Sequence, residues 1–209
     1  MNSVSKQQLV QWLEIAADKF EAEKDYLTEL DRQIGDADHG INMNRGFHKV
    51  REKLPDFIDK DIGTIMKSTG MALLSSIGGA SGPLYGTFFI RSAASATAKD
   101  ELDLAELATM LQDGLDGVQQ RGKAEANDKT MVDTWLAILD SLNSNQDKPL
   151  LEALGEALQA GEQGMKKTID MQARKGRASY LGERSIGHQD PGATSSYFLF
   201  EALCKAAIP

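Results

Sequence analysis

The chain has 209 residues, 41% of them hydrophobic and 26% charged, which is the balance of an ordinary globular domain. Its 23 lysines and arginines against 31 aspartates and glutamates give a formal charge of −8, which argues against a nucleic-acid-binding protein. The single cysteine, Cys204, excludes an internal disulfide and a cysteine-rich metal site. No apolar run approaches the ~20 residues of a membrane span, and no leader is visible, so we expect one cytoplasmic domain over residues 1–209 with no membrane partner.

Apolar residues recur at helical spacing along almost the whole chain, and no strand-like alternation is visible. The first helix is predicted to begin after Ser5, which forms a capping-box pattern with Gln8, and to end or bend at Gly35. Seven further helices are predicted at about 42–54, 62–74, 83–98, 103–118, 130–142, 149–169 and 194–206. Eight helices and no strand predict an all-α fold, either an antiparallel bundle or a helical barrel.

Three aspartates, Asp31, Asp36 and Asp38, form the first candidate site. An extended segment directs Asp36 and Asp38 to the same side, and a turn at Gly35 brings Asp31 back beside them. Three converging carboxylates repel one another unless a cation lies among them, and their hard oxygen atoms suit Mg²⁺ or Ca²⁺. This segment is not an EF-hand, because neither the glycine nor the bidentate glutamate that an EF-hand loop requires stands at its position. The alternative is a polar turn with solvated acids, and the adjoining glycines favour the metal site.

A glycine-rich segment, Gly78–Pro83, directly precedes a predicted helix. Small residues let backbone N–H groups approach an anion, and a helix N-terminus adds a favourable dipole. The segment fits a phosphate cradle and a tight helix–helix corner equally well. A second segment, Gly117–Ala124, nearly matches a P-loop but follows a helix instead of a strand, so we do not interpret it as one. Gly122 and the turn at 127–131 remain candidates to line a site.

The segment 174–192 is predicted to be a loop of about nineteen residues, and loops of that length in a compact domain are usually functional or disordered. It carries Arg174, Lys175, Arg177 and Arg184 in an otherwise acidic chain. Arginine suits bidentate recognition of phosphate. A solvated basic loop is the alternative. Beside a metal site and a glycine cradle, a polyphosphate ligand is the simplest joint explanation.

The three histidines show no metal-ligand spacing. His39 and His188 lie in the irregular segments and are candidates for hydrogen bonds to a ligand, whereas His48 is expected on a helix surface. Trp12 and Trp135 lie at helical spacing and are expected in the core.

Three long motifs, Leu30–Gly40, Gly78–Pro83 and Gly176–Gly192, occur in the order seen in a known family. With them the chain resembles, over essentially its whole length, the nucleotide-binding L subunits of bacterial dihydroxyacetone kinases. The resemblance implies an eight-helix antiparallel barrel with the nucleotide site at one end. That fold agrees with the helix count obtained from the apolar pattern.

The resemblance also implies the roles of single residues. Asp31, Asp36 and Asp38 would hold two Mg²⁺ ions that bridge the nucleotide phosphates, and Arg177 would be the catalytic residue that stabilises the transferring group. The implied nucleotide contacts are His39, Gly40, Ile41, Asn42, Gly79, Ala80, Ser81, Gly122, Thr130, Met131, Arg177, Asp190, Pro191 and Gly192.

The resemblance is to the stand-alone subunit of the enzyme that depends on phosphoenolpyruvate and the phosphotransferase system, because one helical unit uses the whole length. In that type, a tightly held ADP is a cofactor. A phosphohistidine of the M subunit phosphorylates it to ATP, which passes the phosphoryl group to dihydroxyacetone on the K subunit. Two alternatives stay open: a nucleotide-loaded regulatory protein that docks onto others, and an ATP-exchanging kinase subunit for another small acceptor.

Overall fold

Nine α-helices make up most of the computed structural model, which describes residues 3–208. They are α1 (Lys6–Ala22), α2 (Lys24–Ile34), α3 (His39–Lys53), α4 (Ile62–Ser76), α5 (Ser81–Ser92), α6 (Leu104–Gly122), α7 (Met131–Ser144), α8 (Leu150–Lys167) and α9 (Pro191–Ala207). Short 3₁₀ helices lie at Leu54–Asp56, Thr168–Asp170 and Arg177–Ser185. Two short strands, β1 (Ser3–Ser5) and β2 (Glu101–Asp103), pair antiparallel with Val4 opposite Leu102.

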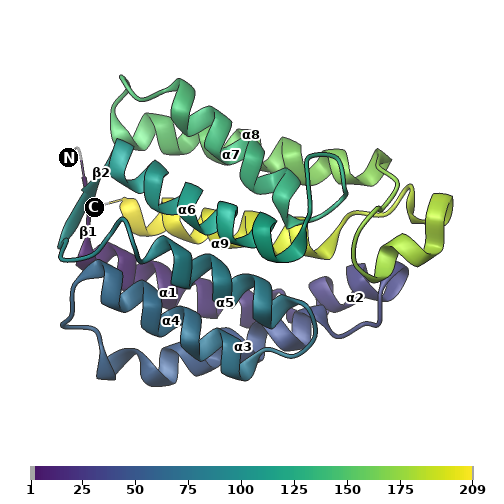
Figure 1. The fold of residues 1–209 in the computed structure, drawn as a ribbon, viewed down its shortest axis with the longest axis horizontal. Coiled ribbons are helices and arrows are strands. Elements are labelled where there is room, and N and C mark those ends of the chain that lie inside the picture. The colour runs from purple at the N-terminus through teal and green to yellow at the C-terminus, as the bar shows by residue number, and fades with distance from the viewer. Residues whose placement is uncertain (1–2, 209) are drawn as a thin grey trace.

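Eight of the nine helices, which run roughly along the long axis of the molecule in Figure 1, form a closed ring through their contacts. Around it, α1 packs on α3, each helix from α3 to α8 packs on the next helix along the chain, and α9 returns to α1. The remaining helix, α2, packs against α3 and α9 at one end of the molecule, where Arg177–Ser185 also lies. The two strands lie at the opposite end (Figure 1). The predicted all-α bundle or barrel is therefore confirmed. None of the described helices is both long and apolar enough to cross a membrane.

The predicted single helix before Gly35 is wrong, because the structure has two helices there. The break lies at Glu23, whose φ of −98° and ψ of 9° leave the helical region. Neither glycine nor proline marks this position, so the sequence carries no punctuation signal. The expected absence of strands is also wrong for β1 and β2. Each has three residues, which is too short for an alternating pattern to show.

Aromatic side chains fill the middle of the ring and fix its helices relative to one another. Trp12 and Trp135 are completely buried, as the sequence predicts. The ring centroids of Trp12 and Phe89 lie 5.5 Å apart, and Trp135 stacks on Phe88 at 4.6 Å. The indole N–H of Trp12 donates a hydrogen bond of 2.8 Å to the carbonyl oxygen of Leu199. This core holds α1, α5, α7 and α9 in place, so the loops at the site end start from rigid supports.

Candidate metal and nucleotide site

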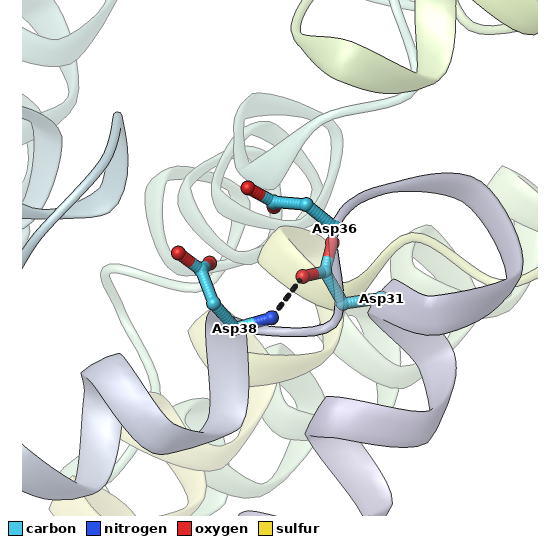
Figure 2. Close-up of side chains that lie close together, drawn as sticks. All are labelled: Asp31, Asp36 and Asp38. Carbon is cyan, nitrogen blue, oxygen red and sulfur yellow. Dashed lines mark hydrogen bonds between the residues drawn. The ribbon is translucent and has the colours of Figure 1, made fainter.

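The structure brings the three aspartates together at the end of α2. Asp31 lies in the last turn of α2, and Asp36 and Asp38 follow in the connection to α3 (Figure 2). One carboxylate oxygen of each lies within 4.8 Å of the others. The backbone N–H groups of Asp38 and His39 donate to Asp31 Oδ2 at 2.9 and 3.1 Å, which fixes that carboxylate. This is the convergence that the motif spacing indicates.

The backbone conformation around Gly35 makes this convergence possible. A Cβ atom on Gly35 would lie 2.0 Å from Asp31 Oδ1, so no other residue leaves room for the carboxylate. Ala37 has a φ of +60°, which is uncommon outside glycine, and it separates Asp36 from Asp38 in the turn. Such a conformation costs of order 1 kcal/mol or more, so the rest of the turn holds it in place.

The donor set fits a divalent cation of the hard class. All three side chains offer carboxylate oxygens, which Mg²⁺ and Ca²⁺ prefer. The positive partner in this cluster is Arg177, whose Nη2 lies 2.9 Å from Asp36 Oδ2, and both side chains are more than one-third exposed. One arginine leaves three close carboxylates under-compensated, so a cation among them lowers their mutual repulsion.

Gly35→Ala is expected to lower the affinity for Mg²⁺ by about 10- to 100-fold, because the new methyl group displaces the Asp31 carboxylate. Isothermal titration with Mg²⁺ measures the change. Gly155→Ala is the matched control, since a Cβ atom at that exposed position in α8 meets nothing within 4 Å. It is expected to leave Mg²⁺ affinity unchanged and to stabilise the fold by about 0.5–1 kcal/mol. Equal Mg²⁺ affinity in both variants would contradict the role of Asp31.

The glycine-rich segment Gly78–Pro83 contains both a tight helix–helix corner and an open position beside the acids, the two alternatives that the sequence left open. Gly82 belongs to a tight corner, because a Cβ atom there would lie 2.2 Å from the carbonyl oxygen of Ile77. Gly79, with a φ of +65°, is open: the nearest atom to its Cβ position is Asp38 Oδ2, at 4.0 Å. The segment thus places the N-terminus of α5, which begins at Ser81, beside the acidic cluster. A helix N-terminus there favours an anionic group.

One pocket joins the acids, the glycine segment, the start of α7, the start of α9 and the segment 172–190, which we call the arginine loop. Residues of the implied site that line it are Asp31, Asp36, Asp38, His39, Gly79, Ala80, Ser81, Thr130, Met131, Arg177, Asp190, Pro191 and Gly192. Further lining residues are Lys129, within the turn at 127–131 that the sequence offers as a candidate, and Ile34, Leu84, Tyr85, Gly176 and Ala178, which it does not single out.

Four residues of the implied site do not line this pocket. A Cβ atom on Gly40 would lie 2.0 Å from backbone oxygen in α2, so this glycine serves the packing of α3 on α2. Ile41 is 50% exposed, and Asn42 is buried beside the glycine segment. Gly122 ends α6 and adjoins Leu84, which does line the pocket. For these four, as for the residues that line the pocket, contact with a nucleotide stays a prediction.

A buried chain of hydrogen bonds supports the pocket floor. His39 Nδ1 lies 3.0 Å from Ser81 Oγ, and His39 Nε2 lies 2.8 Å from Ser195 Oγ. Ser195 Oγ lies 2.6 Å from the hydroxyl of Tyr85. Burial lowers the pKa of His39 and raises the pKa of Tyr85 to about 12. Both side chains are therefore neutral near pH 7 and serve as hydrogen-bonding groups.

His39 can be identified from the sequence as a candidate, whereas most of the side chains around it cannot. Tyr85 and Ser195 lie inside helices, where their spacing shows only that they face the core. Lys129 is 1% exposed, whereas a single lysine in a polar turn is normally solvated. His188 contacts Gln33 at 3.0 Å and does not line the pocket, and His48 is exposed as predicted.

Asp190 gives the site a dependence on pH. Its Oδ2 accepts the backbone N–H of Ala193 at 2.7 Å and caps α9, and burial raises its pKa to about 7 from an ordinary 3.8. A carboxyl group with a raised folded-state pKa destabilises the fold progressively as pH rises from about 4 to about 7, because the unfolded chain ionises first.

Asp190→Asn keeps an oxygen for the cap and removes this titration. We expect the nucleotide-free, Mg²⁺-free variant to exceed the unsubstituted protein in free energy of unfolding at pH 8, by on the order of 1 kcal/mol, with a smaller difference at pH 5. Urea unfolding at the two pH values measures it. A difference that is equal at both, or larger at pH 5, would contradict the assignment.

Comparison with known proteins identifies the family of the chain. The DAK2 domain family matches residues 33–205. The ADP-binding subunit DhaL of the PEP-dependent dihydroxyacetone kinase of Escherichia coli is 59% identical over 207 residues, which cover 98% of this chain and 99% of that subunit. The ADP-binding subunit DhaL of the PTS-dependent dihydroxyacetone kinase of Lactococcus lactis is 45% identical, over 94% of this chain and 95% of that subunit.

A solved structure shows the same fold. The dihydroxyacetone kinase of C. freundii, in complex with AMP-PNP and Mg²⁺, superposes with a TM-score of 0.74 at 24% identity. The superposition covers 94% of this chain and 33% of that longer chain. The resemblance drawn from the three sequence motifs is confirmed. The chain belongs to the DAK2 domain family and, within it, to the DhaL subunits.

Proposed function

We propose that this chain holds ADP and Mg²⁺ as the cofactor of a PEP-dependent dihydroxyacetone kinase. In this proposal a phosphohistidine of an M subunit phosphorylates the ADP in place, and the phosphoryl group then passes to dihydroxyacetone on a K subunit. The observation that carries it is the meeting of three carboxylates, the N-terminus of α5 and Arg177 at one pocket. Support also comes from the DhaL relatives, which are named ADP-binding subunits and match this chain over nearly its full length.

The acidic cluster would hold the metal. Asp36 and Asp38 each present a carboxylate beside that of Asp31, whose Oδ2 is already fixed by two backbone N–H groups. We assign two Mg²⁺ ions to this cluster, and bound Mg²⁺ supplies neutralisation of phosphate charge. The backbone N–H groups at the start of α5 would bind phosphate oxygens, with the hydroxyl of Ser81 beside them.

Arg177 would stabilise the charge on the transferring group. Its guanidinium reaches the acidic cluster through Asp36, yet the side chain is 67% exposed. A planar, permanently charged group at this position can donate to phosphoryl oxygens that two partners approach in turn. Phosphoryl transfer depends mainly on positioning and electrostatic stabilisation, so this chain needs no nucleophile of its own.

The test follows a labelled phosphoryl group from the M subunit. The chain, purified with its bound nucleotide, is mixed with ³²P-labelled M subunit, and the nucleotide is separated from protein after acid quench. We expect label in ATP that stays bound to the chain, and its transfer to dihydroxyacetone once the K subunit is added. Label that stays on the M subunit would contradict the proposal. Label that leaves as free ATP and is replaced from solution would favour the ATP-exchanging kinase instead.

A further inference from the structure

We infer that Lys129 is a positioning residue for the transfer reaction: its ammonium group fixes both ends of the arginine loop and so sets where Arg177 stands beside the acidic cluster. This inference rests on the proposed function, because it assigns Lys129 a role in that same reaction.

The ammonium group of Lys129 contacts both ends of the arginine loop. The residue is 1% exposed. Its Nζ donates to the carbonyl oxygens of Thr168, at 2.6 Å, and Met171, at 3.1 Å, just before the loop. It also donates to the carbonyl oxygen of His188, near the end of the loop. An ammonium group has three N–H donors, so this arrangement uses all of them.

Because all three N–H donors of Lys129 are used, its role is to position the loop and not to contact a ligand directly. Lys129 lines the pocket, and a lysine in that place is an obvious candidate to bind a phosphate group. However, its three donors already have carbonyl acceptors, and none is left for a phosphate oxygen. Burial lowers the pKa of Lys129, while the carboxylates of Asp190 and Asp170 act in the opposite direction and favour the charged form.

The turn that carries Lys129 is held rigidly. The carboxylate of Asp133 accepts the backbone N–H groups of Asn127, at 2.5 Å, and Thr130, at 2.8 Å. Thr130 caps α7 in return, since its hydroxyl accepts the N–H of Val132 at 3.1 Å. Lys129 itself has a φ of +62°, a conformation that is uncommon outside glycine and that these hydrogen bonds hold in place. The ammonium group therefore projects from a fixed support on α7.

The arginine loop transmits this anchoring to Arg177 because it is closed on itself. Ser185 Oγ accepts the N–H of Ala173 at 2.8 Å and donates to the carbonyl oxygen of Gly182 at 2.6 Å. These bonds join the start of the loop to its second half. Arg177 lies between them, with its Nη2 2.9 Å from Asp36. A shift of the loop ends thus moves Arg177 relative to the acids.

Two substitutions separate the bulk of the side chain from its N–H donors. Lys129→Met keeps most of the volume but removes every donor, and Lys129→Ala leaves space for an added amine. We expect both to lower phosphoryl transfer by about 100-fold, the effect of a displacement near 1 Å, while Mg²⁺-dependent retention of ADP changes far less. Amide hydrogen exchange is expected to speed up in 172–189 and not in α1 or α9.

Chemical rescue supplies the decisive comparison. Propylammonium replaces the three carbons and the nitrogen that Lys129→Ala removes, so it is expected to restore transfer at least tenfold and to slow exchange in the loop. Tetramethylammonium, which has no N–H donor, is expected to do neither, and Lys129→Met has no space for rescue. Lys166→Ala, an exposed lysine on α8, serves as the control. Normal transfer in both Lys129 variants, or equal effects of the two cations, would overturn the inference.

Hydrogen exchange and lysine methylation test the role of Lys129 even if the proposed function fails or the variants do not fold. If the unsubstituted chain transfers no phosphoryl group, the proposed function fails, but exchange in 172–189 still tests the anchoring. If neither variant folds by circular dichroism, reductive methylation of the unsubstituted protein tests whether the ammonium group is buried and bonded as described. We expect Lys129 to react at least tenfold more slowly than Lys166, and equal rates would overturn the inference.

Discussion

Asp36→Asn is expected to lower the rate of phosphoryl transfer by roughly 10²- to 10³-fold and to weaken retention of the nucleotide. The substitution keeps the shape of the side chain but removes one negative charge from a cluster whose oxygens lie within 4.8 Å of one another. It also removes the ionic partner of Arg177, but that exposed pair is worth little by itself. Transfer from labelled M subunit and retention of ADP through gel filtration measure the two effects.

The rise in Tm on adding Mg²⁺ is a second measurement of the effect of Asp36→Asn. If Asp36 is a metal ligand, the rise in Tm that Mg²⁺ gives the unsubstituted protein is expected to shrink in Asp36→Asn. Asp25→Asn is the matched control, because that side chain is 95% exposed on the same helix as Asp31. We expect it to keep both the transfer rate and the response to Mg²⁺. Normal turnover in Asp36→Asn would rule out the metal assignment.

Arg177→Ala is expected to lower transfer by about 10³-fold, in the range found for arginines that stabilise transferring phosphoryl groups. The helical circular-dichroism signal is expected to stay intact, because the side chain is 67% exposed and lies outside the nine α-helices. Arg177→Lys is expected to restore only part of the rate, since an ammonium group lacks the planar pair of donors.

Arg184→Ala provides the comparison within the same loop. Arg184 is exposed and does not line the pocket, so its loss tests whether the net charge of the loop is sufficient. We expect transfer at nearly the normal rate. If both arginine variants lost activity equally, a general electrostatic role of the loop would replace the specific one. Loss of helicity in Arg177→Ala would mean that the residue supports the fold.

The helices of the ring can be predicted from the sequence, because apolar residues recur along it at helical spacing. Apolar residues at helical spacing, capping residues such as Ser5 and Asp103, and glycines at helix ends are local signals, and the structure uses them as expected. The break at Glu23 has no such signal, because it depends on α2 packing against α3 and α9. Tertiary contacts that override a continuous helical pattern leave no mark in the local sequence.

The candidate site likewise has a part that the local sequence predicts and a part that it does not. Asp31, Asp36 and Asp38 lie close together in sequence, so their convergence depends on one turn that Gly35 indicates. Lys129 has its partners some 40 to 60 residues away, at carbonyl oxygens that any residue type offers. Backbone acceptors carry no sequence signature, so this contact was beyond prediction from the chain alone.

The most direct test of the fixed-cofactor proposal is acid release of the ligand from gel-filtered protein, followed by chromatographic identification. We expect about one ADP per chain, retained through the column in Mg²⁺ and lost when Mg²⁺ is chelated. An empty chain that binds free ATP and turns it over with its partner would show an exchanging kinase. A chain that neither retains nor binds nucleotide would contradict the account and leave the pocket at α5 without its proposed ligand.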